Sequence, residues 1–151
     1  MKQILCYGDS NTWGYDGESR ERLPWGVRWT SLLQEKLNKE EYRVIEEGLC
    51  GRTTVFENPL RDGRKGTALF PTLLETHAQV DVITLMLGTN DIQPKMHKIP
   101  FTREHLADGL IHLINSGACC LDASGEAKDE NGTPVMKEWW NVTEEDQKAI
   151  M

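Results

Sequence analysis

Three short polar segments of the chain hold groups suited to acyl-transfer chemistry. Ser10, in the turn Gly-Asp-Ser at residues 8–10, offers a hydroxyl nucleophile directly after an apolar run. Gly51 has no Cβ atom, so its backbone N–H can come close to a substrate oxygen. Asn90, in Gly-Thr-Asn-Asp at residues 88–91, can donate its side-chain amide to a developing oxyanion. Each segment taken alone is also typical of an ordinary turn.

The three segments share one feature, because each follows a predicted strand. The strands are recognised by short apolar or β-branched runs, typical of a parallel sheet buried on both faces. They are residues 4–7, 42–45 and 80–87. Apolar residues at helical spacing predict helices over 28–38, 69–77 and 103–115.

The third predicted helix has a defined buried side and a defined end. Its apolar residues are Leu106, Leu110, Ile111, Leu113 and Ile114. Gly117 is well placed to cap its C-terminus, because glycine adopts the left-handed conformation that such a cap requires. After Gly117 the pattern weakens, with a short strand predicted over 118–121 and a final helix opening near Thr143.

The order strand, helix, strand, helix, strand, helix is typical of right-handed βαβ crossovers. It predicts an α/β fold with three layers, in which helices cover both faces of a parallel sheet. Ligands of such sheets bind at the carboxyl ends of the strands. Ser10, Gly51 and Asn90 are all expected at that edge, which makes it the candidate active site.

The three segments resemble, in order, the first three sequence blocks of the SGNH (GDSL-like) hydrolases. Residues 28–30, 46–49 and 52–54 are similar to the arylesterase and acyltransferase branch of that family. The resemblance covers roughly residues 2–117, and three blocks in order on the right elements are more specific than any one motif. It implies the three-layer, flavodoxin-like α/β/α fold of these enzymes, here shortened on the C-terminal side.

The resemblance implies a serine esterase that acts on short-chain acyl or acetyl esters. Ser10 is the implied nucleophile, forming an acyl-enzyme that water resolves or that passes its acyl group to an alcohol. The Ser10 N–H, the Gly51 N–H and the Asn90 side chain form the implied oxyanion hole. Asp9 and Asp91 are expected to support the loops. Trp13 either lines the substrate pocket or packs as an ordinary aromatic residue.

The sequence departs from the family in its last block. The family places its general base in a late Asp-x-x-His motif, and residues 118–151 contain no histidine. The four histidines are His77, His97, His105 and His112. His97 is the best candidate for a substitute base, because it follows Asn90 at the active edge. The alternatives are a deletion that keeps the fold and impairs catalysis, or a truncated form of a longer polypeptide.

Two other functions compete with the esterase. One is a catalytically silent SGNH-fold protein that binds an ester, a glycan or only an oligomer partner. The other is a flavodoxin-like binding domain, although the sequence has no glycine-rich phosphate-binding motif. A shortened parallel sheet leaves an exposed strand edge, so a homo-oligomer is expected.

The length, net charge and cysteine spacing of the chain limit the kinds of partner and cofactor that are expected. The 151 residues suit a single domain spanning 1–151, and the net charge of −7 argues against nucleic acid or an anionic membrane surface. The short apolar run at residues 4–7 is no signal peptide, so a cytoplasmic location is expected. The four cysteines lack metal-ligand spacing. We therefore expect no metal and no cofactor, and a small ester as the substrate.

Overall fold

The computed structural model of the chain describes residues 1–93 and 102–118. It divides into two compact units. The first holds Met1–Arg52 with Gln79–Leu87, and the second holds Thr53–Ala78 with the described residues from Gly88 onward. The single-domain organisation predicted for residues 1–151 stays a prediction.

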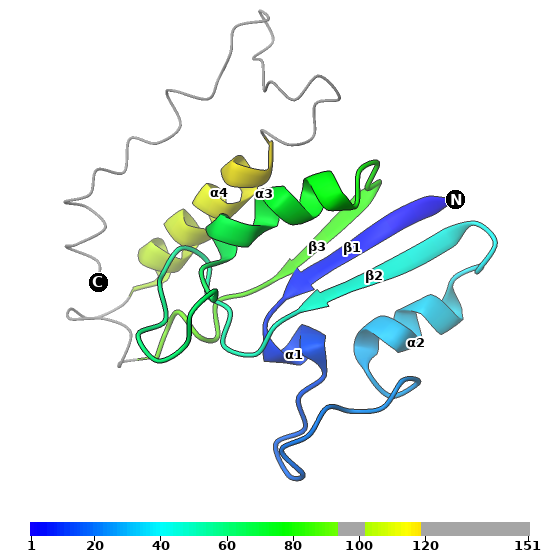
Figure 1. Ribbon diagram of the computed structural model, residues 1–151, viewed down its shortest axis with the longest axis horizontal. Helices are drawn as coiled ribbons and strands as arrows, with labels where there is room; N and C mark the ends of the chain where they lie inside the picture. Colours follow the sequence, from blue (N-terminus) through cyan, green and yellow to red (C-terminus); the bar gives the residue numbers. More distant parts are fainter. Residues whose placement is uncertain (94–101, 119–151) are drawn as a thin grey trace, which may run out of the picture. The chain divides into compact units, whose positions relative to one another are not determined.

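The first unit is built on a sheet of three parallel strands in the order β2-β1-β3. The strands are β1 (Lys2–Gly8), β2 (Tyr42–Gly48) and β3 (Val82–Met86). Strand β1 lies between the other two (Figure 1), and its Leu5 pairs with Ile45 on one side and with Ile83 on the other. The three predicted strands and their parallel arrangement are thereby confirmed.

One face of this sheet is covered by helix α2 (Trp29–Lys36), which connects β1 to β2. Trp29 and Leu33 of the helix pack against a cluster of Ile4, Cys6 and Val44 on the sheet. The same face of β3 is less protected, because Val82 and Met86, in register with Ile4 and Gly8, are 46% and 43% exposed. The central strand is therefore the best-buried element of the unit.

The second unit pairs helices α3 (Gly66–Thr76) and α4 (Arg103–Ala118), which run side by side in Figure 1. α3 begins earlier than predicted, because its first N–H groups find acceptors. Gly66 N–H donates to the Thr53 carbonyl at 3.1 Å, and Thr67 N–H donates to the Thr54 carbonyl at 3.0 Å. These bonds satisfy two of the donors that a helix start leaves unpaired.

Two predictions about α4 were wrong. Gly117 lies inside the helix rather than capping it, and a Cβ atom there would be 2.3 Å from a ring carbon of Phe70. The glycine is thus explained by the close approach of α4 to α3. Ile111 and Ile114 are 52% and 53% exposed, whereas Leu113 is fully buried.

None of the helices in the described residues is both long and apolar enough to span a membrane.

Candidate active site

Ser10 lies where the central strand ends. It is the first residue of the short helix α1 (Ser10–Trp13), two residues after the last residue of β1. Asp9 caps this helix, and its Oδ1 accepts a hydrogen bond from the Asn11 N–H at 2.9 Å. The helix ends at Gly14, whose φ of +88° is left-handed, so that the Gly14 N–H reaches the Ser10 carbonyl at 2.9 Å. Ser10 is therefore held in a compact turn that is capped at both ends, and it is itself only half-buried.

A pair of glycines allows α1 to lie against the sheet. Gly8 and Gly48 end β1 and β2 and are in register with each other. A Cβ atom at Gly48 would lie 2.1 Å from the backbone nitrogen of Trp13, and one at Gly8 would lie 2.1 Å from Thr12 Oγ1. Only glycine fits such contacts. Sequence reasoning did not assign Gly48 to the site, although two glycines that end neighbouring strands are a usable signal.

Gly51 belongs to the same compact unit as Ser10. Its φ of +84° is left-handed, a conformation that glycine adopts without strain. The segment before it is fixed to the nucleophile turn, because the Leu49 N–H donates to the Gly8 carbonyl at 3.1 Å. Among the described residues, neither the Ser10 N–H nor the Gly51 N–H donates a hydrogen bond. Both donors are thus open to a ligand oxygen within this part of the chain.

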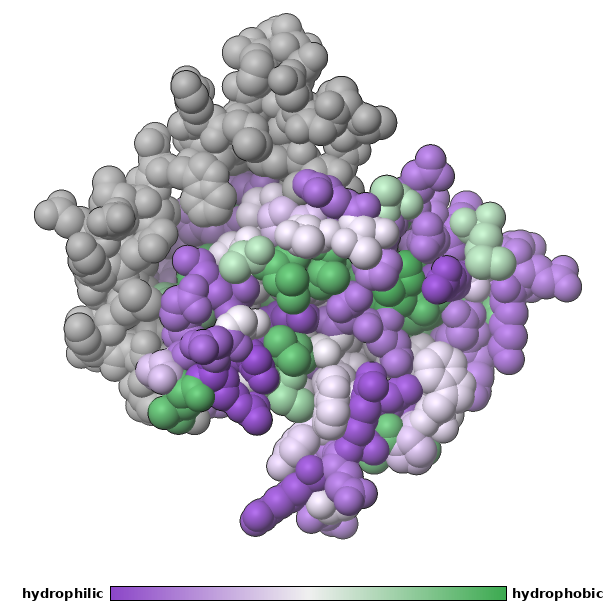
Figure 2. All heavy atoms as spheres, viewed as in Figure 1, coloured by the Kyte–Doolittle hydropathy of each residue, from purple (hydrophilic) through white to green (hydrophobic). Residues whose placement is uncertain are grey.

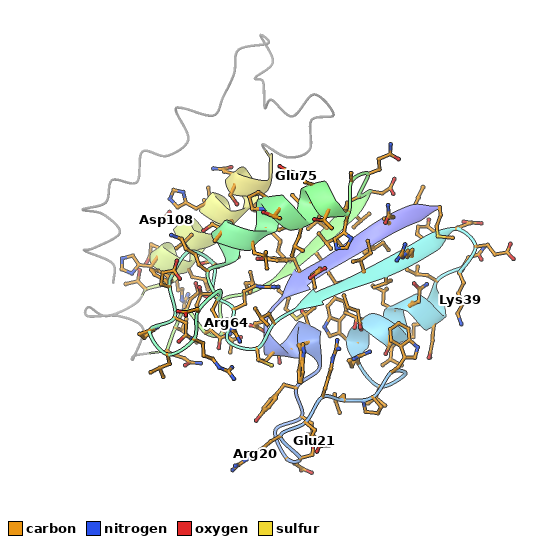
Figure 3. All side chains as sticks on the ribbon, viewed as in Figure 1. Arg20, Glu21, Lys39, Arg64, Glu75 and Asp108 are labelled. Atoms are coloured by element: carbon orange, nitrogen blue, oxygen red, sulfur yellow. The ribbon has the colours of Figure 1, made fainter. Side chains whose placement is uncertain are left out.

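Trp13 is held by an arginine of the loop that joins α1 to α2. The Arg22 guanidinium stacks 5.2 Å from the Trp13 ring centre, and its Nε donates to the Trp13 carbonyl at 2.8 Å. Arg22 also lies 3.4 Å from the Glu46 carboxylate. The tip of the loop, where Arg20 and Glu21 are labelled in Figure 3, is exposed, and Figure 2 shows this loop as mostly hydrophilic.

Glu46 also binds the base of the same loop. Its carboxylate lies 3.2 Å from the Arg28 guanidinium and accepts a hydrogen bond from the Thr30 hydroxyl. Arg28 is 8% exposed and stacks 5.5 Å from the ring centre of Trp25. One acidic side chain of β2 therefore binds the segment between α1 and α2 at two points, in its middle at Arg22 and at its end at Arg28.

Asn90 and Asp91 lie in the second compact unit. Asn90 Oδ1 accepts a hydrogen bond from Gln93 Nε2 at 3.1 Å. Asp91 is fully buried, and its Oδ1 accepts hydrogen bonds from the N–H and the hydroxyl of Thr54, at 2.9 and 2.5 Å. The buried carboxylate thus joins the segment that carries Asn90 to the segment that opens this unit.

A family model places the chain among known proteins. The GDSL-like lipase/acylhydrolase family matches residues 6–139. The chain belongs to this family. The parallel sheet with flanking helices is the α/β fold of its SGNH members, as the sequence predicted.

Solved structures give the same relationship. A carbohydrate acetylesterase family member from Sinorhizobium meliloti is 45% identical, with a TM-score of 0.70 over 76% of this chain and 53% of that chain. The native aryl esterase of M. smegmatis is 36% identical, with a TM-score of 0.73 over 89% of this chain and 60% of that one. The chain therefore spans somewhat more than half the length of these GDSL-like esterases.

A short segment of the chain is also similar to L-fucose isomerases. Over 40 residues the chain is 62% identical to an L-fucose isomerase from Bacteroides thetaiotaomicron, which is 26% of this chain and 7% of the isomerase. An L-fucose isomerase from Clostridium perfringens is 52% identical over 44 residues, again 7% of that protein. The chain spans only this small fraction of the curated relatives that it matches.

The three histidines that the structure describes in this GDSL-like chain lie in the second unit. His77 follows α3, and its N–H donates to the Leu73 carbonyl at 2.9 Å. His105 and His112 lie on α4, as predicted, and His105 Nδ1 accepts a hydrogen bond from the Thr102 N–H at 3.1 Å. The proposed substitute base, His97, lies outside the described residues.

Two buried titratable groups of β1 lie beneath the nucleophile turn. Burial raises the pKa of Tyr7 to about 12, an effect that the Arg52 guanidinium partly opposes. Burial likewise raises the pKa of the Cys6 thiol. Both groups are therefore neutral at neutral pH, and neither is poised as a general base.

Proposed function

We propose that this chain is a carboxylic-ester hydrolase that uses Ser10 as its nucleophile. The observation that carries the proposal is the placement of Ser10 at the carboxyl end of β1, in one compact unit with Gly51. This is the edge at which parallel α/β sheets bind ligands. The family match and the esterase neighbours support the same assignment.

The proposed reaction proceeds through an acyl-enzyme. Ser10 Oγ attacks the ester carbonyl carbon and transfers its proton to a general base, for which His97 is the proposed residue. The carbonyl oxygen becomes an oxyanion and accepts hydrogen bonds from the Ser10 N–H, the Gly51 N–H and the Asn90 side chain. The C–O bond then breaks, the alcohol leaves with a proton, and water hydrolyses the acyl-enzyme. An alcohol in place of water gives acyl transfer.

We propose a short acyl or acetyl ester as the substrate. The solved relatives are described as a carbohydrate acetylesterase and as aryl esterases. Trp13 lies three residues after Ser10, at the end of the same helix, and Arg22 holds its ring. An aromatic side chain held three residues after the nucleophile suits a planar or apolar alcohol group.

The second candidate is a catalytically silent protein of the same fold. It is favoured by the half-exposed strand β3, where Val82 and Met86 offer an apolar surface to a second copy. We therefore also propose a homo-oligomer, which light scattering after size exclusion tests. The isomerase likeness covers 7% of that enzyme and supports no activity here.

Hydrolysis of p-nitrophenyl acetate by the wild type and by Ser10→Ala separates the two candidates. The esterase requires turnover in the wild type, loss of turnover in Ser10→Ala, and covalent labelling of Ser10 by a fluorophosphonate. Equal background rates in both proteins, with no label on Ser10, support the silent protein. In an active enzyme, unchanged turnover in His97→Ala would exclude His97 as the base.

A further inference from the structure

Arg52 is a charged side chain buried in the first unit. It is only 2% exposed and follows Gly51 directly. Its Nη1 donates to the Gly8 carbonyl at 2.9 Å and also to the Glu47 carbonyl, and its guanidinium stacks 4.1 Å from the Tyr7 ring centre. Burying a charge is costly unless hydrogen bonds compensate it. The identity of these two carbonyl acceptors therefore shows which segments the residue holds together.

The two acceptors belong to the two segments that carry the proposed oxyanion donors. Gly8 ends β1, two residues before Ser10, whereas Glu47 lies near the end of β2, four residues before Gly51. The backbone adds a parallel connection, since the Arg52 N–H donates to the Leu49 carbonyl and the Leu49 N–H donates to the Gly8 carbonyl, each at 3.1 Å. One nitrogen of Arg52 therefore bridges segments that lie far apart in the sequence.

We propose that Arg52 is a positioning residue that sets the Gly51 N–H relative to the Ser10 N–H, a role that rests on the proposed esterase function. It touches no reacting atom. A planar guanidinium suits the task, because it can stack on the Tyr7 ring while it donates to carbonyls in its own plane. Gly51, in its left-handed conformation, contributes no side chain to hold the loop, so the next residue supplies the anchor.

This role affects the transition state more than the substrate complex. Donors aimed at a developing oxyanion strengthen as charge forms, and a small displacement weakens them. Loss of the bridge is therefore expected to lower kcat by about tenfold or more, while KM changes less than about twofold. Substitution of a residue that only filled space would lower the stability of the fold, but it would not lower kcat while KM stays nearly constant.

The experiment compares Arg52→Met, which keeps the apolar stem and removes every donor, with Arg52→Lys and with the control Arg43→Met. Arg43 is exposed on β2, and its substitution makes the same change of charge. Hydrogen exchange of the full chain, read by mass spectrometry, is followed in peptides that cover residues 8–14 and 48–54. Kinetics with p-nitrophenyl acetate are measured on the same proteins.

We expect faster exchange in both peptides of Arg52→Met, together with the fall in kcat, and no change in Arg43→Met. Arg52→Lys keeps a charge and a donor, so it should restore part of both readouts. If Arg52→Met does not fold, Arg52→Lys against wild type carries the comparison, with a smaller change of the same kind. Faster exchange in neither segment, or in one alone, overturns the bridge, and a rise in KM at constant kcat overturns its role in positioning.

The exchange experiment keeps the two proposals apart. A wild type without turnover and without label on Ser10 contradicts the esterase, whereas its exchange pattern still decides whether Arg52 joins the two segments. A wild type that turns over, with exchange unchanged in Arg52→Met, contradicts the bridge alone.

Discussion

Thr54 donates two hydrogen bonds to one oxygen of the Asp91 carboxylate, from its N–H at 2.9 Å and from its hydroxyl at 2.5 Å. Both side chains are fully buried. The same hydroxyl lies where a Cβ atom at Gly109 would come within 2.4 Å, so α4 packs closely over this pair. The segment carrying Asn90 is therefore tied to the interior of the second unit by one threonine and one aspartate.

Thr54→Val is expected to destabilise the protein by about 1–3 kcal/mol, because it removes the hydroxyl and leaves a buried carboxylate under-bonded. Urea denaturation followed by circular dichroism measures the change. Thr54→Ser keeps the donor and loses only a methyl group, so its loss should be smaller. A Val variant as stable as the Ser variant would show that the hydroxyl contributes nothing.

Gly48→Ala is expected to disrupt the nucleophile turn. The added Cβ atom would meet the Trp13 backbone nitrogen at 2.1 Å, so either α1 or the end of β2 must move. Overpacking of this kind costs about 1–3 kcal/mol or more. Both thermal stability and the rate of fluorophosphonate labelling at Ser10 should fall.

Gly17→Ala provides the matched control for Gly48→Ala. A Cβ atom at Gly17 has no heavy atom within 4 Å, so the substitution should change the free energy of unfolding by less than about 0.5 kcal/mol. Equal stability of the two alanine variants would contradict the close approach of α1 to the sheet.

The two arginines bound to Glu46 should differ in their importance. Arg28 is nearly buried, whereas the Arg22 side chain is 39% exposed. Arg28→Met is expected to cost about 3 kcal/mol, because it leaves the Glu46 carboxylate without its buried partner. Arg22→Met should cost less than about 1 kcal/mol, since water and salt screen an exposed pair. Chemical denaturation of both variants at low and high salt tests this order, and equal losses would refute it.

The raised pKa of the buried Tyr7 phenol predicts that the fold loses stability in alkaline solution. Its pKa is raised to about 12 by burial, above the ordinary value of 10.0, so the unfolded chain loses the phenolic proton first. The contribution is therefore complete below about pH 10 and disappears as the pH rises through about 12. The difference of two pKa units between the folded and the unfolded chain corresponds to about 3 kcal/mol in the free energy of unfolding.

Urea midpoints between pH 8 and 11.5 measure this effect. Tyr7→Phe should flatten the alkaline slope, while the buried Cys6 thiol, whose pKa is also raised, keeps part of it. Comparison of slopes removes any change of stability at neutral pH. Identical slopes in the wild type and in Tyr7→Phe would show that the phenol titrates equally in both states.

Much of the fold was readable from local patterns. Strand β1 can be recognised from the sequence because both of its faces are apolar. Ser10 follows the strand closely, so the strand and the nucleophile turn are predicted together. Helix α4 was placed correctly, and Leu113 is buried as predicted, but Ile111 and Ile114 were wrongly assigned to its buried side. The reason is that small residues, Gly109 and Gly117, form the packed side and let isoleucines face outward.

The parts that could not be predicted depend on partners distant in sequence. Arg52 has no local reason to be buried, and only the fold brings the Gly8 carbonyl to it. Glu46 likewise binds Arg22 and Arg28, which lie in the middle and at the end of the segment between α1 and α2. Sequence patterns locate a side chain on an element, but they do not reveal which distant carbonyl or carboxylate it will meet.

The order of the strands also has a consequence for synthesis. The central strand leaves the ribosome before both of its neighbours, since Leu5 pairs with Ile45 and Ile83, which are synthesised much later. At roughly 5–20 residues per second, the nascent chain holds an apolar segment without its second neighbour for seconds. Slow codons before residue 83, or a chaperone that binds the nascent chain before residue 83 is synthesised, should therefore alter the yield of native protein. The same interventions later in the chain should alter it less.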